Sequence, residues 1–132
     1  MTERTWIVPA ELQAIPKTRA EVRKYLADHG ISDAYDVLTV ICELVTNALL
    51  HGKPDIELTL TLGEGCIRGA VVDHGPQMPQ PRQPDADDDG GRGLHIVHQY
   101  TRRWGVQPLS HGSQGESQGK CVWFECGVGA AS

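Results

Sequence analysis

A carboxylate and an amide lie one helical turn apart near the end of the longest helix that the pattern predicts. Glu43 and Asn47 are spaced i, i+4, so both side chains leave the same face of a helix. Apolar residues recur around this pair with helical spacing and must face a core. They are Val37, Leu38, Val40, Ile41, Leu44, Val45, Ala48 and Leu49. The polar pair therefore lies at the edge of an apolar face.

This pair has a chemical and a plain interpretation. An amide oxygen such as that of Asn47 suits a Mg²⁺ ion that also contacts phosphates, because Mg²⁺ takes few protein ligands and keeps several waters. Glu43, one turn earlier, could orient or deprotonate a nucleophile aimed at a terminal phosphate. His51 extends the same stripe by another turn. Alternatively, these are solvated side chains at a helix edge.

Asp73 ends a predicted strand, and Gly75 follows two residues later. A carboxylate in this place can accept a hydrogen bond from an amino group inside a pocket, such as the exocyclic amine of adenine. Gly75 would let the backbone pass close to a flat ring. The alternative is an Asx-type turn, which is the commoner role of an isolated Asp-x-Gly.

Glycines precede a predicted short helix over residues 94–100. The run Gly90-Gly-Arg-Gly93 could direct backbone amides at an anion, with a favourable helix N-terminus behind it. Taken alone, the run also fits a flexible loop with an N-cap. A Rossmann site is excluded because no strand leads into these glycines, and a Walker loop because no Gly-Lys-Ser/Thr follows.

Two helices are predicted in the first part of the chain. Residues 5–8 form a short edge strand that Pro9 ends. The capping box Thr18–Glu21 predicts a first helix to about His29, followed by Gly30. We expect Val22, Tyr25, Leu26 and His29 on its inner face and Arg19, Arg23 and Lys24 outside. Ser32 or Asp33 would cap the second helix, which runs to Leu50 or His51 and ends at Gly52.

Strands dominate the rest. Strict alternation over 56–62 predicts a half-buried strand, joined by the turn 63–65 to a second strand over 66–72. Residues 76–89 hold four prolines and an acidic run over 85–89, which is typical of a lid or a disordered loop. Strands over 104–106 and 119–125 enclose a Ser/Gly/Gln-rich loop over 107–118.

The totals describe one ordinary soluble domain of 132 residues. We assign residues 1–127 to the domain and 128–132 to a flexible tail. A net charge of −5 argues against a nucleic-acid surface, which needs clustered Lys and Arg. The four cysteines have neither zinc-type spacing nor close pairing, which favours reduced thiols in a cytoplasmic protein. No apolar run is long enough to cross a membrane.

Taken together, the motifs resemble the GHKL (Bergerat-fold) ATPase superfamily. Within it the chain is most similar to the anti-sigma-factor serine kinases and to small stand-alone histidine-kinase-like ATP-binding proteins. The N box matches as Glu43–Gly52, the first glycine box as Asp73–Pro76 and the second as Gly91–Val97. The strand Gly119–Trp123 matches the last core strand, so the resemblance covers nearly the whole chain.

The resemblance implies roles for individual residues. Asn47 would bind Mg²⁺, Glu43 would be the base, and Asp73 would bind the adenine amine of ATP. Gly75 would shape the adenine pocket. The four residues Gly91, Arg92, Gly93 and Leu94 would cradle the phosphates, and residues 76–90 would form the ATP lid.

One position departs from the family pattern. Many members have a threonine after the glycine of the closing strand, where it contributes to a water-mediated adenine contact. Here the residue is Lys120, which leaves the predicted adenine pocket resting on Asp73. The acidic run in the lid would repel a triphosphate, so we expect it to face solvent.

The resulting expectation is a two-layer α/β (α+β) sandwich, with a mixed, mostly antiparallel sheet and about three helices on one face. It would be a Mg-ATP-dependent serine/threonine protein kinase of the partner-switching type that regulates transcription. Its partners would be a sigma factor or an anti-sigma-factor antagonist, met through Arg19 and the first helix. The alternative is a nucleotide-dependent binding module with little or no phosphoryl transfer.

Three smaller expectations complete the prediction. Arg4, Trp6 and Ile7 could form the edge of a homodimer, because an unpaired strand invites strand addition. His95 and His98 have a spacing that could hold zinc, but no third ligand is evident, so we expect solvated or half-buried histidines. Cys42 is expected in the core with Ile41 and Val45.

Overall fold

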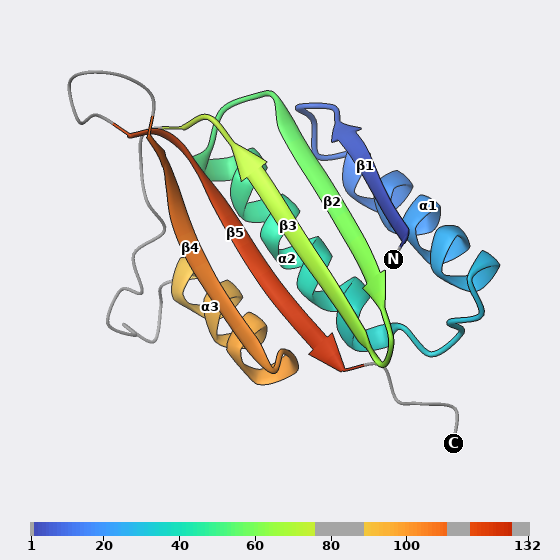
Figure 1. The fold of residues 1–132 in the computed structure, drawn as a ribbon. Helices are drawn as coiled ribbons and strands as arrows, with labels where there is room; N and C mark the ends of the chain where they lie inside the picture. Colours follow the sequence, from blue (N-terminus) through green and yellow to red (C-terminus); the bar gives the residue numbers. More distant parts are fainter. Residues whose placement is uncertain (1, 76–88, 111–116, 128–132) are drawn as a thin grey trace.

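The computed structural model describes residues 2–75, 89–110 and 117–127, and within them the chain forms two layers (Figure 1). One layer is a five-stranded sheet in the order β1-β2-β3-β5-β4. The other consists of three helices, all on one face of the sheet, as the sequence predicts. All the described strand pairs are antiparallel, so the expectation of a mixed sheet is wrong for this part of the chain. The elements are β1 (Thr2–Val8), α1 (Ala14–Asp28), α2 (Tyr35–His51), β2 (Ile56–Gly63), β3 (Cys66–Asp73), α3 (Asp89–Tyr100), β4 (Arg103–Ser110) and β5 (Ser117–Gly127).

The central hairpin β2–β3 follows directly from the sequence pattern. Ile56, Leu58 and Leu60 are buried and alternate with half-buried polar residues, as a sheet covered by helices on one face requires. Glu64 and Gly65 alone connect the strands, and Gly65 has a φ of 68°. Glycine reaches positive φ at little steric cost, so it permits this tight turn.

Helix α2 lies across the middle of the sheet (Figure 1) and buries its predicted apolar face against it. It ends at Gly52, whose N–H donates to the carbonyl of Ala48 at 2.8 Å. Its start differs from the prediction, because the N-cap is Ala34 and no side chain caps the helix. Ala34 is itself buried. Packing of the first turn into the core therefore takes the place of a polar cap.

Helix α1 begins at Ala14, before the predicted capping box. Pro16 lies in its first turn, where a missing N–H costs no helical hydrogen bond. Thr18, the predicted cap, is instead a buried residue within the helix. The end agrees with the prediction: Gly30, at φ 82°, donates to Ala27, and the next N–H donates to Leu26.

Two predicted orientations on α1 are wrong. His29 is exposed instead of core-facing, and its Nδ1 lies 2.8 Å from the carbonyl oxygen of Tyr25. Arg19 is half-buried instead of outward-facing, with its Nε inaccessible to solvent. Burial raises the pKa of the Cys42 thiol, and the positive charge of Arg19 lowers it by a smaller amount. Arg19 therefore leans toward α2, while Arg23 and Lys24 are exposed as predicted.

The last third of the chain is more regular than expected. Helix α3 begins at Asp89, so Gly90, Gly91 and Gly93 lie within its first turns and not before them. Strand β4 continues to Ser110, through residues 107–110 that were predicted as loop. Because β4 is an edge strand, Pro108 needs no ladder partner on its outer side. Residues 89–90 of the predicted lid (76–90) belong to α3, and residues 117–118 of the predicted loop belong to β5. The segments 76–88, 111–116 and 128–132 lie outside the described residues.

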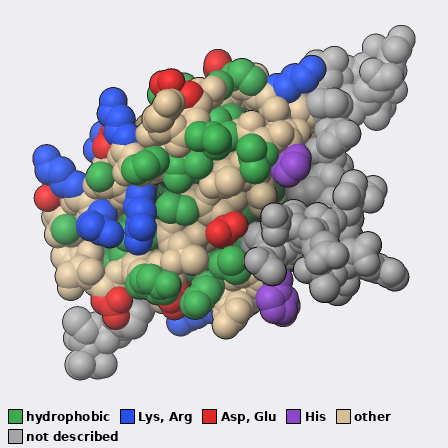
Figure 2. All heavy atoms as spheres, turned by 180° about the vertical axis from the view of Figure 1, so that it is seen from behind, with side chains coloured by type: hydrophobic (Ala, Val, Ile, Leu, Met, Phe, Trp, Pro, Cys, Tyr) green, Lys and Arg blue, Asp and Glu red, His purple; other side chains and the backbone are tan. Residues whose placement is uncertain are grey.

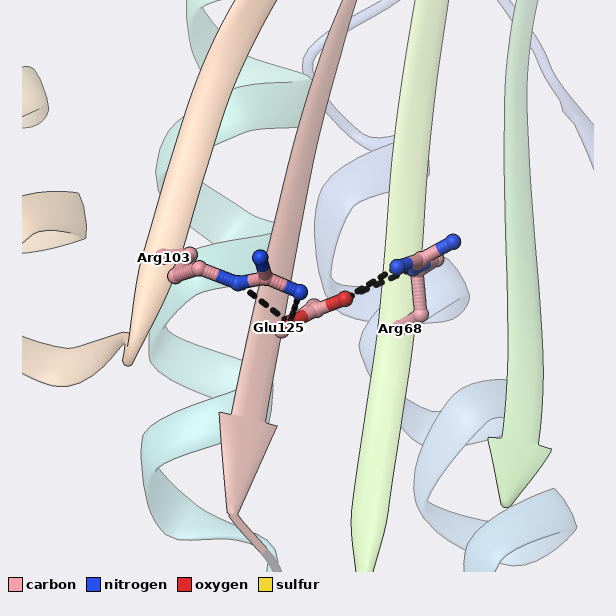
Figure 3. Close-up of polar contacts among 3 residues, drawn as sticks. All are labelled: Arg68, Arg103 and Glu125. Carbon is pink, nitrogen blue, oxygen red and sulfur yellow. Dashed lines mark hydrogen bonds and ion pairs between the residues drawn. The ribbon is translucent and has the colours of Figure 1, made fainter.

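The sheet face away from the helices carries a charged cluster that the sequence analysis did not single out. In Figure 3, Glu125 of β5 lies between Arg68 of β3 and Arg103 of β4. Arg68 Nε donates to Glu125 Oε1 at 3.0 Å, and Arg103 Nη2 donates to Oε2 at 2.7 Å. Arg68 and then Arg103 hold the pKa of Glu125 below its ordinary value. The cluster joins the three neighbouring strands on their solvent side.

Strand β1 forms one edge of the sheet, as predicted. Trp6 is buried against Tyr25 of α1, whereas Ile7 is 62% exposed.

All four cysteines are free thiols. Cys126 is buried and the others, Cys42 included, are half-buried. Burial raises the pKa of Cys126 to about 12. Within the described part of the chain, no helix is both long and apolar enough to cross a membrane.

Candidate nucleotide site between α2 and the sheet

A small hollow lies where α2 passes the ends of β3 and β5. It is narrow in this structure, with about 10 Å³ of free volume, roughly the room of one water molecule. Four apolar side chains and three polar ones line it: Leu44, Ala48, Val71, Val122, Asn47, Asp73 and Lys120. Three elements distant in sequence thus contribute to one apolar pocket with a few converging polar groups, the usual composition of a small-ligand site.

Asp73 lines this hollow and is 1% exposed. It is the last residue of β3, and its Oδ1 accepts a hydrogen bond from the N–H of Gly75 at 2.8 Å. That bond is the Asx-type turn which the sequence analysis held as an alternative. The second oxygen, Oδ2, is left for another partner. The turn and a ligand-binding role are therefore compatible in one carboxylate.

The other partner of Asp73 in this structure is Lys120. The two residues are direct cross-strand neighbours in the β3–β5 ladder. Lys120 Nζ lies 2.8 Å from Asp73 Oδ2, and Lys120 is 4% exposed. The contact is an ion pair by distance, but Nζ makes no hydrogen bond of normal geometry within the described part of the structure.

Two glycines let the backbone close around Asp73. A Cβ atom on Gly52 would lie 2.4 Å from Asp73 Cγ, and one on Gly75 would lie 2.7 Å from the Cα of Gly52. Both distances are shorter than side-chain carbons tolerate, so the end of α2 can approach the turn after β3 only with glycine at these positions. The role predicted for Gly75 in an adenine pocket stays a prediction.

The structure brings together only some of the predicted residues. Asn47 and Asp73, from α2 and β3, line the same hollow. Glu43 is half-buried one turn earlier on α2 and is not among the residues that line it. His51 is exposed at the end of the helix. Gly91, Arg92, Gly93 and Leu94 belong to the first turns of α3, and their proposed phosphate contacts stay a prediction.

The lining chemistry fits a purine nucleotide with Mg²⁺. Aliphatic side chains can cover both faces of a flat ring, and an aspartate with one oxygen directed to the hollow can accept from an amino group. Asn47 offers a single neutral oxygen, and the described residues contain no group of three or more His, Cys, Asp and Glu side chains that could hold a metal. A Mg²⁺ ion that takes most of its ligands from phosphates and water needs no such group.

Comparison with known proteins assigns the family. A family model described as a histidine kinase-like ATPase domain matches residues 8–125, which is most of the chain. The chain belongs to this family. Asn47, Asp73 and Lys120 all lie within the matched part of this ATPase domain, and the match implies ATP binding.

Solved structures share the fold. The structure of the RsbU and RsbW domains of Rv1364c from Mycobacterium tuberculosis superposes with a TM-score of 0.69 at 23% identity, over 97% of this chain and 33% of that one. This chain thus spans about a third of the length of that structure's chain. The mycobacterial sensor histidine kinase MprB matches with a TM-score of 0.54 at 16% identity, over 96% and 97% of the two chains. The catalytic domain of histidine kinase ThkA gives 0.54 at 14%, over 97% and 98%.

The feature of the hollow that the sequence does not predict is the contact of Lys120 with Asp73. The departure of Lys120 from the family pattern is visible in the sequence, but its partner is not. The register between two strands determines which residues are neighbours across them. Asp73 and Lys120 can therefore be recognised as neighbours only when the register between β3 and β5 is known. No local pattern in either strand gives this register.

Proposed function

We propose that this ATPase domain binds Mg-ATP and transfers its terminal phosphate to a serine or threonine hydroxyl of an antagonist protein in a partner-switching system. The observation that carries the proposal is the convergence of Asn47 and Asp73 on one hollow. Asn47 belongs to the N box and Asp73 to the first glycine box of the motif pattern that resembles the anti-sigma-factor serine kinases. The fold shared with a structure that contains an RsbW domain supports the same choice.

Each residue would do a separate part of the work. Asp73 would accept a hydrogen bond from the amino group of adenine and so hold the adenine ring in place. Asn47 would bind Mg²⁺, which neutralises charge on the phosphates when bound. Glu43 would take the proton from the attacking hydroxyl. Gly91–Leu94, in the first turns of α3, would lie against the phosphates at the end of the helix that favours negative charge.

The partner protein would bind at the α1 end of the molecule. Figure 2 shows the helix side, where Lys and Arg side chains gather toward one end, over α1. Lys17, Arg23 and Lys24 are exposed there, and Arg19 is half-buried among them. A cluster of cations of this kind steers an acidic partner surface toward the site. A sigma factor or an antagonist with an acidic contact surface would fit it.

A second candidate function, a nucleotide-dependent binding module, is favoured by the place of Glu43. The residue does not line the hollow with Asn47 and Asp73. If Glu43 does not reach the terminal phosphate, nucleotide binding would reorganise the surface of the protein without transfer. The two functions differ in whether phosphate leaves the nucleotide.

Phosphoryl transfer is tested by incubating the protein with γ-labelled Mg-ATP and candidate antagonist proteins. For the kinase we expect label on a serine or threonine of the antagonist, and a loss of about 10²-fold or more in rate with Glu43→Gln. Glu64→Gln, in the exposed β2–β3 turn, is the matched control and should transfer normally. Nucleotide binding without label on any antagonist would favour the module. Transfer that persists in Glu43→Gln would remove the base assignment.

The role of Asn47 predicts a loss of binding that folding does not share. In Asn47→Ala we expect ADP affinity to fall at least about tenfold with Mg²⁺ present, since a ligand to the ion is removed, with little change in EDTA. Calorimetric titration measures the affinity, and a thermal melt measures the fold. His51→Ala, on an exposed residue one turn further along α2, is the control. An equal loss with and without Mg²⁺ would make Asn47 a structural residue.

A further inference from the structure

Lys120 presents an ammonium group that the proposed roles above leave unused. It is 4% exposed, lines the hollow, and its Nζ has no hydrogen bond of normal geometry within the described residues. An ammonium carries three N–H donors. The contact with Asp73 Oδ2 compensates the positive charge of Lys120. The remaining N–H donors of the ammonium group could bind a ligand in the hollow. Buried donors without acceptors are costly, so an acceptor atom at this point would be bound strongly.

The neighbouring carboxylate limits what that ligand can be. Asp73 Oδ1 is occupied by the N–H of Gly75 at 2.8 Å, which leaves Oδ2 as the oxygen beside Lys120 Nζ. The hollow therefore offers one acceptor and one donor side by side. A complementary ligand must present one donor next to one acceptor along a single edge.

We propose that Lys120 is a base-recognition residue, which donates directly to N1 of adenine while Asp73 Oδ2 accepts from the 6-amino group. This inference rests on the proposed nucleotide-binding function and adds a specificity-determining residue to it. N1 and the 6-amino group are neighbours on the adenine ring, acceptor beside donor, which is the pattern that the pair requires. A charged donor makes the stronger kind of hydrogen bond.

Guanine fits the same pair less well. Its corresponding edge presents the O6 acceptor and two adjacent donors, N1–H and the 2-amino group. A carboxylate binds both donors only when both its oxygens face the base, and Oδ1 of Asp73 is held by Gly75. One donor of guanine would be left unpaired in a buried place, which is a strong basis for rejection.

The test compares ADP with two analogues that each lack one ring nitrogen. In 1-deaza-ADP the acceptor that Lys120 would use is a C–H group, whereas 3-deaza-ADP lacks a nitrogen that is not next to the amino group. With Mg²⁺ present, we expect the wild-type protein to bind 1-deaza-ADP at least about tenfold more weakly than ADP and 3-deaza-ADP nearly as tightly as ADP. Calorimetric titration gives all three dissociation constants.

A variant cycle assigns the effect to this side chain. In Lys120→Met the ratio of the 1-deaza-ADP and ADP dissociation constants should fall to about one, because no donor is left to discriminate the two ligands. In Lys53→Met, an exposed lysine that does not line the hollow, the wild-type ratio should persist. Because a ratio is taken within each protein, a general loss of stability in a variant does not affect the comparison.

The outcomes separate this inference from the function on which it rests. Equal binding of ADP and 1-deaza-ADP by the wild-type protein overturns the role of Lys120 even if Lys120→Met does not fold. A ratio that persists in Lys120→Met overturns it as well. If the wild-type protein binds no adenine nucleotide at all, the proposed function itself fails. Selective loss with 1-deaza-ADP that disappears in Lys120→Met supports the direct contact.

Discussion

At the level of single residues, Asp73 and Lys120 depend on each other for stabilisation of their charges. They are 1% and 4% exposed, so water solvates neither one well. An interior ion pair does not need to contribute net stability compared with two apolar residues, but removal of one partner leaves an unpaired buried charge. The residues that we propose to bind the base therefore also stabilise the fold.

This dependence predicts the order of stability of the wild-type protein, a single variant and a double variant. Asp73→Asn should lower the free energy of unfolding by about 3 kcal/mol or more, because the Lys120 ammonium loses its counter-charge. Adding Lys120→Met to the same protein should restore most of that loss, since no unpaired charge is left. Urea unfolding followed by circular dichroism measures the three free energies. A double variant as unstable as the single one would show that charge pairing is not the cause.

The residues of the site differ in how far the sequence predicts them. Asn47 and Asp73 were predicted because each stands at a recognisable position, on a helix stripe and after a strand, and the structure places both at one hollow. The ion pair with Lys120 could not be predicted in the same way. It depends on the register between two strands that are separated by the whole of α3 and β4. Local patterns contain no such information.

At the level of elements, the contact between the end of α2 and the end of β3 is tight. Gly52 ends the helix, and its missing side chain leaves room for the carboxylate of Asp73. The helix that provides Asn47 and the strand that provides Asp73 are thereby fixed at one point. Their relative position determines the width of the hollow between them.

Gly52→Ala should therefore damage both stability and nucleotide binding. The new Cβ would lie 2.4 Å from Asp73 Cγ and 2.7 Å from the Ala48 carbonyl oxygen, and overpacking of this kind costs about 1–3 kcal/mol. We expect a lower unfolding midpoint and weaker ADP binding. Gly63→Ala is the matched control, since its nearest neighbour would be 3.8 Å away. Equal behaviour of the two alanine variants would contradict the packing argument.

Element types were predicted better than element ends. The periods of α2 and of the β2–β3 hairpin are long and regular, and both elements form as expected. The start of α1 was missed because a proline in a first turn looks like a helix breaker while it is compatible with one. Residues 107–110 were assigned to a loop on composition, but pairing with β5 extends β4 through them. Tertiary contacts override weak local preference in such segments.

At the level of the whole molecule, one face of the sheet is covered by helices and the other carries the cluster of Arg68, Glu125 and Arg103 (Figure 3). Both arginines hold the pKa of Glu125 below its ordinary value, Arg68 more strongly. A carboxyl group with a lowered pKa in the folded state contributes stability above its unfolded pKa. That contribution is lost as pH falls through the folded value.

Stability should therefore decline as pH falls below about 4.5, the usual range of a glutamate. In Glu125→Gln the part of this decline that comes from the cluster should be absent, so the unfolding midpoint should depend less on pH. The arginines are largely exposed, so added salt should reduce the difference. Thermal melts from pH 3 to 7 measure it, with Glu64→Gln as the control. An unchanged pH dependence in Glu125→Gln would exclude the cluster as its source.

The pairing of β3 with β5 also determines when the site comes into existence during folding. Helix α2 and the β2–β3 hairpin are consecutive and rich in local contacts, which form early, whereas Asp73 meets Lys120 only after the last strand has docked. A chain folded only as far as β3 has the carboxylate but not its partner. The hollow therefore belongs to the completed fold alone. Nucleotide, by binding there, would draw the population toward fully folded chains and away from partly folded ones.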